Sequence, residues 1–168
     1  RLFRDLFGID RILWLDHGEL EGDDTDGHID MLARFCDTGT IAYTQCTDAR
    51  DRNHAGLSAM EAQLQTFRTS DDQPYRLIAL PLPRPVHDRT GRRLPASYAN
   101  FLVINGAVLV PVYDDPADGV ALERLVAGFP GHEIVPVNCL TLIHQYGSLH
   151  CLSMQFPQGV EFHTPTAG

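Results

Sequence analysis

The chain has 168 residues, 43% of them hydrophobic and 21% charged, which excludes an intrinsically disordered chain and is typical of a globular protein. The formal net charge of −9 argues against nucleic acids and anionic membranes as partners, because both require clustered positive charge. The same charge favours a cationic substrate. All thirteen basic residues are arginine, which excludes Schiff-base chemistry and lysine-dependent phosphate loops.

The first elements along the chain are a helix and a short strand. Residues 1–7 have the pattern of a helix, and residues 11–15 that of a strand. The strand is followed by a loop over residues 18–27 that is rich in glycine and acidic residues. No apolar run approaches the roughly 20 residues needed to span a bilayer, and no charged-then-apolar leader opens the sequence, so we expect no membrane partner.

The order strand, strand, helix, strand then occurs for the first time. Apolar runs over residues 27–35 and 39–45 flank a turn composed of Asp37, Thr38 and Gly39. A helical pattern follows over about 53–69, and a third strand is expected over 75–80.

The same order occurs again further along the chain. Apolar runs over residues 98–104 and 107–112 flank Asn105-Gly106, a strong two-residue hairpin signal because both residues tolerate positive φ. A helix is expected from Pro116 to about residue 127 with Asp115 as its N-cap, followed by a strand over 133–137. Aligning Gly39-Thr-Ile-Ala-Tyr with Gly106-Ala-Val-Leu-Val gives an offset of 67 residues, natural for repeated ββαβ modules.

Two regions lie outside these repeats. Residues 81–95 contain several prolines and arginines and are expected to cross the surface between the modules. The strand over 11–15 and a strand expected over 148–154 have no module of their own. Such unpaired edges predict association with other chains, including a homo-oligomer.

The four cysteines show no metal-knuckle or redox-pair spacing. We therefore expect a reducing, cytoplasmic location, with Cys36, Cys46 and Cys139 acting as small buried apolar residues. Cys151 is different, because it stands in the Leu-His-Cys run at 149–151 and is the expected nucleophile.

His28 and Asp30 are the expected companions of Cys151. They stand two residues apart in the run Gly-Asp-Asp-Thr-Asp-Gly-His-Ile-Asp, so in an extended chain both side chains would leave the same face and converge on one ligand. The same alternation in a strand over 148–154 would turn His150 away from a site that Cys151 faces.

These motifs resemble the second half of the agmatine deiminase and Porphyromonas-type peptidylarginine deiminase family. The resemblance also includes Ser-Tyr-Ala-Asn-Phe at 97–101, Asn-Gly-Ala-Val-Leu-Val-Pro at 105–111 and Asp-Pro-Ala-Asp at 115–118. It implies an α/β fold, a partial pentein-like α/β propeller built of ββαβ modules. Residues 1–168 would then be a single fragment of a deiminase domain, with modules over about 27–80 and 98–137 and partial modules at both ends.

The resemblance also implies roles for individual residues. Cys151 corresponds to the nucleophile, His28 to the catalytic histidine, and Asp30 to a carboxylate that holds the guanidinium, with Asp24 also touching the substrate. The family's other guanidinium carboxylate lies in an N-terminal segment that has no counterpart here. The run from Gln145 to Leu149 differs from that of most agmatine deiminases, so agmatine, free arginine and peptidyl-arginine all stay open as substrates.

The implied reaction is hydrolysis of a guanidine with release of ammonia and needs no metal or organic cofactor. Cys151 would attack the guanidinium carbon while His28 protonates the departing nitrogen.

Two alternatives to this function stay open. The chain could be a truncated, non-catalytic module that binds cations or pairs with another chain. The acidic loop could instead hold Ca²⁺ or Mg²⁺ through Asp23, Asp24, Asp26, His28 and Asp30.

Overall fold

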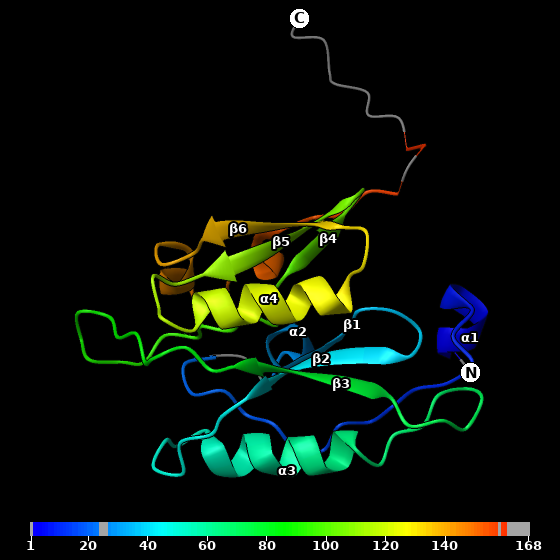
Figure 1. The fold of residues 1–168 in the computed structure, drawn as a ribbon, viewed down its shortest axis with the longest axis horizontal. Coiled ribbons are helices and arrows are strands. Elements are labelled where there is room, and N and C mark those ends of the chain that lie inside the picture. The colour runs from blue at the N-terminus through cyan, green and yellow to red at the C-terminus, as the bar shows by residue number, and fades with distance from the viewer. Residues whose placement is uncertain (1, 24–26, 158, 161–168) are drawn as a thin grey trace, which may run out of the picture.

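The computed structural model describes residues 2–23, 27–157 and 159–160. Its elements form a stack of layers, with one three-stranded sheet, a helix, a second three-stranded sheet and an outer helix (Figure 1). The helix between the sheets, α4 (Asp118–Gly128), contacts strands of both. The structure is therefore a mixed α/β fold, as the sequence predicts.

The first sheet has the strand order β1-β2-β3 and consists of β1 (Ala33–Phe35), β2 (Thr40–Gln45) and β3 (Arg76–Pro81). β1 is antiparallel to β2, whereas β3 is parallel to it. A parallel pair requires a crossover connection, and α3 (His54–Leu64) lies within it. The predicted strands over 39–45 and 75–80 are confirmed, and so is the helix, although it is shorter than 53–69. Of the strand predicted over 27–35, only residues 33–35 form one, because the helix α2 (Ile29–Leu32) precedes them.

The second sheet repeats this arrangement with β4 (Leu102–Ile104), β5 (Ala107–Val112) and β6 (Glu133–Asn138) in the order β4-β5-β6. β4 and β5 form the predicted hairpin, in which Gly106 has a φ of 77°. β6 is parallel to β5, and α4 crosses between them. The predicted strands over 107–112 and 133–137 and the helix between them are confirmed, whereas only residues 102–104 of the run 98–104 form a strand.

One backbone contact shows how closely the two regions correspond. The carbonyl of Gly39 accepts a hydrogen bond from the N–H of Arg76 at 2.9 Å, and the carbonyl of Gly106 accepts one from Glu133 at 2.9 Å. Gly39 and Gly106 are the two residues that the sequence alignment equates. Equivalent residues of the two regions therefore stand at the start of the parallel strand pair in each sheet.

Before the first sheet, α1 (Leu2–Phe7) confirms the predicted N-terminal helix. No strand forms over Arg11–Leu15, so that prediction is wrong. An extended segment becomes a strand only where another strand pairs with it, and residues 11–15 are not part of either sheet.

The start of α4 also differs from the prediction. The helix begins at Asp118, and Asp115 is not its N-cap. The carboxylate of Asp115 instead accepts the N–H of Ala117 at 2.8 Å, which holds a turn ahead of the helix. Asp118 in turn accepts the hydroxyl of Tyr98 at 2.7 Å and the N–H of Tyr113 at 3.1 Å.

The connection over residues 81–95 runs mostly at the surface, as predicted, but its last residues are buried. Arg93 is 8% exposed and makes two hydrogen bonds to the carboxylate of Asp51, at 2.8 and 2.9 Å. Leu94 joins the core that lies between the two sheets. The expectation that residues 81–95 cross the surface is therefore wrong at this end.

All four cysteines are free. Cys46 and Cys139 are buried and Cys36 is partly buried, as predicted, whereas Cys151 is exposed. Burial raises the pKa of the Cys36 thiol to about 11, so this thiol is inert at neutral pH.

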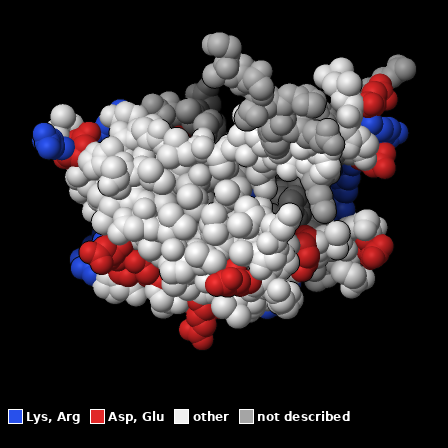
Figure 2. All heavy atoms as spheres, turned by 90° about the horizontal axis from the view of Figure 1, so that it is seen from above, with Lys and Arg blue, Asp and Glu red and all other residues white. Residues whose placement is uncertain are grey.

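None of the helices in the described part of the chain is long and apolar enough to cross a membrane. The face in Figure 2 is formed mostly by uncharged residues, with acidic groups along its lower edge. Basic groups lie at the left and right margins of this face, next to acidic ones.

Candidate active site

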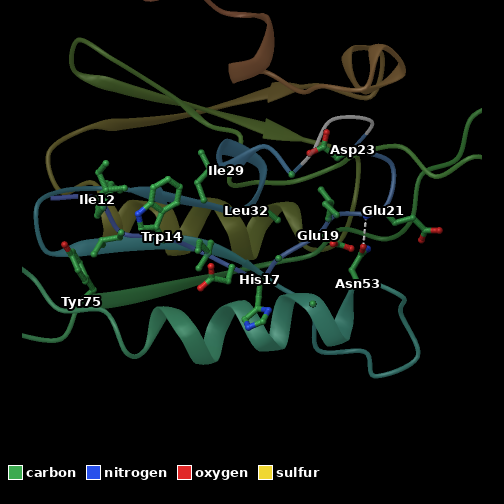
Figure 3. Close-up of a pocket in the computed structure, with 18 of the residues that line it drawn as sticks. Ile12, Trp14, His17, Glu19, Glu21, Asp23, Ile29, Leu32, Asn53 and Tyr75 are labelled. Atoms are coloured by element: carbon green, nitrogen blue, oxygen red, sulfur yellow. Dashed lines mark hydrogen bonds between the residues drawn. The ribbon is translucent and has the colours of Figure 1, made fainter. Parts of the chain in front are cut away.

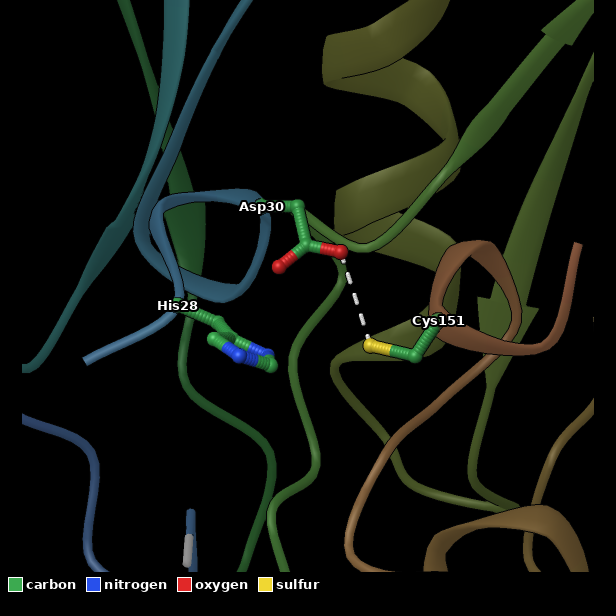
Figure 4. A group of neighbouring side chains, drawn as sticks. All are labelled: His28, Asp30 and Cys151. Carbon is green, nitrogen blue, oxygen red and sulfur yellow. Dashed lines mark hydrogen bonds between the residues drawn. The ribbon is translucent and has the colours of Figure 1, made fainter. Parts of the chain in front are cut away.

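His28, Asp30 and Cys151 lie together. One ring nitrogen of His28, one carboxylate oxygen of Asp30 and Sγ of Cys151 are all within 4.8 Å of one another. The first two come from the start of α2 (Ile29–Leu32) and the third from the 3-10 turn η2 (His150–Leu152), as Figure 4 shows. The fold thus brings together the three residues that the sequence singles out, although Cys151 lies more than 120 positions after the other two.

The backbone around His28 and Asp30 is not the extended segment that the spacing suggests. His28 is extended, with a φ of −66° and a ψ of 119°, but Asp30 already lies in the first turn of α2. The carboxylate of Asp23 accepts the N–H of His28 at 3.1 Å and holds the chain ahead of this turn. The expectation of an extended run is wrong, and the two side chains converge because the chain turns between them.

His150 contradicts its prediction. The chain after η1 (Leu142–Gln145) forms no strand over 148–154, but the turn η2. Neighbouring side chains in such a turn do not alternate between opposite faces, so His150 and Cys151 can serve one site. Nδ1 of His150 lies 2.7 Å from Oδ2 of Asp30.

Asn100 is a site residue that the sequence analysis does not single out. It is fully buried, and its amide group contacts both sides of the site. Nδ2 donates to Oδ2 of Asp30 at 3.0 Å and lies 3.2 Å from Sγ of Cys151. Oδ1 accepts the backbone N–H groups of His150 at 2.8 Å and of Cys151 at 3.4 Å. The sequence signal that could have identified Asn100 is the presence of an asparagine between apolar residues at the end of the 97–101 motif.

These contacts set the charge states of the site. Burial raises the pKa of Asp30, but hydrogen bonds from His150, Cys151 and Asn100 outweigh burial, so the pKa of this carboxyl lies below its ordinary value of 3.8. Burial and the neighbouring charge of Asp30 raise the pKa of the Cys151 thiol. The resting site therefore holds a carboxylate that accepts a hydrogen bond from a protonated thiol, with Sγ 3.4 Å from Oδ2 of Asp30.

A buried hydroxyl network joins the two segments that carry these groups. The hydroxyls of Thr44 and Ser97 are 2.8 Å apart and lie 3.0 and 2.7 Å from the carbonyl oxygen of Met31, next to Asp30. The hydroxyl of Tyr113 accepts the N–H of Ser97 at 3.0 Å and lies 2.8 Å from Oγ of Ser148, near Cys151. Satisfied buried networks of this kind fix relative positions, so the network helps to hold α2 and η2 in register.

A groove of about 1460 Å³ runs beside the site along residues 9–23 (Figure 3). Its lining includes Trp14, Ile29 and Tyr75, and Trp14 is 71% exposed. At its polar end the side chain of Asn53 accepts the N–H of Glu21 at 2.7 Å. None of His28, Asp30 and Cys151 lines this groove, so it adjoins the site without containing it. Asp24, the other residue expected to touch substrate, lies outside the described residues.

The amino-acid sequence is similar to known deiminases. Agmatine deiminase of Stutzerimonas stutzeri is 32% identical over 173 positions, which cover 93% of this chain and 47% of the relative. The chain therefore spans about half the length of the curated relatives that it matches.

The fold is similar to solved deiminase structures. A Porphyromonas gingivalis protein described as a candidate arginine deiminase is 52% identical with a TM-score of 0.90, covering 94% of this chain and 46% of that one. A cysteine-to-serine variant of C. jejuni agmatine deiminase with substrate bound is 40% identical with a TM-score of 0.81, covering 89% of this chain and 43% of that one. The family model for Porphyromonas-type peptidyl-arginine deiminases matches residues 1–157, which confirms the resemblance seen in the motifs. The chain belongs to the Porphyromonas-type peptidyl-arginine deiminase family.

Proposed function

We propose that this chain carries the nucleophile-bearing part of a guanidine deiminase, a hydrolase that releases ammonia from agmatine or a related arginine derivative. The observation that carries the proposal is the approach of a thiol, a carboxylate and an imidazole within 4.8 Å. The family membership and the agmatine deiminase relatives support the same reaction class.

In the proposed reaction, Asp30 binds the guanidinium and holds it flat against Sγ of Cys151. The thiolate attacks the central carbon, and His28 donates a proton to the departing nitrogen, which leaves as ammonia. Water, deprotonated by His28, then attacks the same carbon, the C–S bond breaks, and a ureido product leaves. The chemistry proposed for these side chains calls for no cofactor.

The charge states favour attack only when a cation is bound. The negative charge of Asp30 raises the pKa of the Cys151 thiol in the resting site. A bound guanidinium would offset that charge and add its own, so both effects favour the thiolate. His150 and Asn100 act in this scheme as positioning residues, because each contacts Oδ2 of Asp30.

The proposal extends to the architecture. The two ββαβ regions, offset by 67 residues, support a partial pentein-like propeller within a single deiminase fragment, with modules over 27–80 and 98–137. In such a ring a remaining half of similar size would provide a second guanidinium carboxylate. The groove in Figure 3, with the exposed Trp14 on its wall, is the face that we assign to contact with that half, because the chain spans 47% of its relative.

The non-catalytic alternative is not favoured. A module that had lost its chemistry would be under no constraint to keep the thiol 3.4 Å from the carboxylate and beside an imidazole. Three statements remain predictions: that the substrate is a small cationic guanidine, that the protein associates with itself, and that it is located in the cytoplasm.

The test is ammonia release by the natural protein that contains these 168 residues, with agmatine, free arginine and a peptidyl-arginine as substrates. We expect iodoacetamide to block release in step with alkylation of Cys151, located by peptide mass spectrometry. The variant Cys151→Ala should be inactive, whereas the matched control Cys36→Ala should be active. Turnover that persists with Cys151 fully alkylated would refute the proposal.

A further inference from the structure

The candidate site contains three different kinds of metal-binding atom. Within the described part of the chain, His28, Asp30 and Cys151 are the one group of three or more His, Cys, Asp or Glu residues whose ligand atoms come this close. His28 and Cys151 are exposed, so an ion can reach them from solvent. Figure 4 shows the three side chains pointing toward a common space from α2 and η2.

The distance between the sulfur and the carboxylate oxygen fits a tetrahedral ion, and the ring nitrogen of His28 lies within 4.8 Å of both atoms. Bonds of about 2.3 Å to sulfur and about 2.0–2.2 Å to oxygen or nitrogen place tetrahedral S and O ligands about 3.5 Å apart. Sγ of Cys151 lies 3.4 Å from Oδ2 of Asp30. Little movement is therefore needed for an ion to take the place of the thiol proton between these two atoms.

The ligand types select the ion. A thiolate with an imidazole and a carboxylate suits Zn²⁺, whereas Mg²⁺ and Ca²⁺ require a shell made almost wholly of oxygen atoms. Two further residues support one of these ligands from behind. His150 and Asn100 both contact Oδ2 of Asp30 and fix the orientation of its carboxylate.

We propose that Cys151, His28 and Asp30 bind one Zn²⁺ ion, with the fourth position open to water. The bond between zinc and Sγ replaces the S–H bond, so binding releases one proton to solvent and involves no change of oxidation state. The ion occupies the thiolate and carboxylate that a guanidinium would need, so zinc and a guanidine substrate exclude each other. Zinc binding itself does not depend on the proposed deiminase activity.

Zinc binding is tested by titrating the chain without any assay of turnover. Isothermal titration calorimetry in two buffers of different ionisation enthalpy should give one Zn²⁺ per chain and about one proton released near neutral pH. Co²⁺ in place of Zn²⁺ should produce a thiolate-to-cobalt absorption band. Saturating Zn²⁺ should also protect Cys151 from iodoacetamide.

Matched variants separate this site from accidental binding. Cys151→Ser and His28→Asn should each weaken binding by more than 100-fold, and His150→Gln by about 10-fold as an outer-layer change. The controls Cys36→Ser and His144→Asn should bind as the unchanged chain does, and circular dichroism should show that every variant is folded. Equal zinc affinity in Cys151→Ser, absence of the cobalt band, or binding of Ca²⁺ or Mg²⁺ in preference to Zn²⁺ would overturn the proposal. The ammonia assay is separate, so the deiminase proposal can fail or stand independently.

Discussion

Nδ1 of His150 lies 2.7 Å from Oδ2 of Asp30, although the two residues are 120 positions apart in the sequence. The side chains are 30% and 17% exposed, so the contact is partly shielded from solvent. Asn100 and Cys151 contact the same oxygen. Oδ2 of Asp30 therefore contacts three side chains, and each contact leads to an effect that can be measured.

Replacing His150 with glutamine should disturb the binding carboxylate more than the chemical step. The variant loses a hydrogen bond that lowers the pKa of Asp30, so this pKa should rise. In the natural protein we expect KM for the guanidine to rise several-fold with a smaller change in kcat, and the acidic limb of kcat/KM to move to higher pH. The exposed His144, changed to glutamine, is the control. Equal losses in KM and kcat with an unmoved pH profile would indicate a structural role only.

The same contact predicts a pH dependence of stability. The pKa of folded Asp30 lies below its ordinary value of 3.8, so its interactions stabilise the fold fully above pH 3.8 and weaken as the pH falls through the lower folded-state pKa. The difference in urea stability between the unchanged chain and His150→Gln should therefore be largest above pH 3.8 and shrink below it. A difference that grows on acidification would contradict this assignment.

Replacing Asp30 with asparagine should make Cys151 more reactive. The charge of Asp30 is one cause of the raised thiol pKa, so its removal should lower that pKa. At neutral pH the variant should react faster with iodoacetamide, as measured by mass spectrometry of the peptide that carries Cys151. Cys36, whose pKa is about 11, is the internal control and should stay unmodified.

Asn100 should be sensitive even to conservative change. Asn100→Ala removes the side-chain oxygen that accepts the N–H groups of His150 and Cys151, which we expect to cost about 1–3 kcal/mol in the free energy of unfolding. Asn100→Asp keeps an acceptor but places a second negative charge beside Asp30, so it should also raise the pKa of Cys151. Urea denaturation and the pH profile of alkylation distinguish the two effects. An alanine variant as stable as the unchanged chain would show that the amide does not hold the turn.

Arg93 should contribute strongly to stability away from the site. Its guanidinium is buried against Asp51, whose pKa it lowers, so Arg93→Gln leaves a largely buried carboxylate without its cation. We expect a loss of about 3 kcal/mol in urea denaturation near neutral pH, compared with almost none for the exposed Arg89→Gln. The loss should shrink in acid as Asp51 is protonated. Similar effects of the two substitutions would refute this role.

Local sequence signals predicted much of the fold. The hairpin at Asn105-Gly106 and the helix before β6 depend on turn residues and on periodicity, which are properties of neighbouring residues. The segment Arg11–Leu15 failed because a strand is defined by its pairing, and no short window of sequence contains the partner.

Part of the candidate site could likewise be predicted from the sequence, and part could not. His28, Asp30 and Cys151 stand out as residue types, and the fold brings them within 4.8 Å. The prediction that His150 turns away from the site was wrong, because a short stretch of mixed apolar and polar residues fits a strand and a 3-10 turn equally well. Asn100 was missed because its partners lie 50 to 70 positions away and nothing local marks them.

Trp14 is the sole tryptophan of the chain and stands 71% exposed on the wall of the groove. Indole emission shifts to shorter wavelength when water is removed from the ring, so this residue is a built-in optical reporter of whatever covers that face. Its fluorescence gives a direct reading of assembly that requires neither a label nor a substrate.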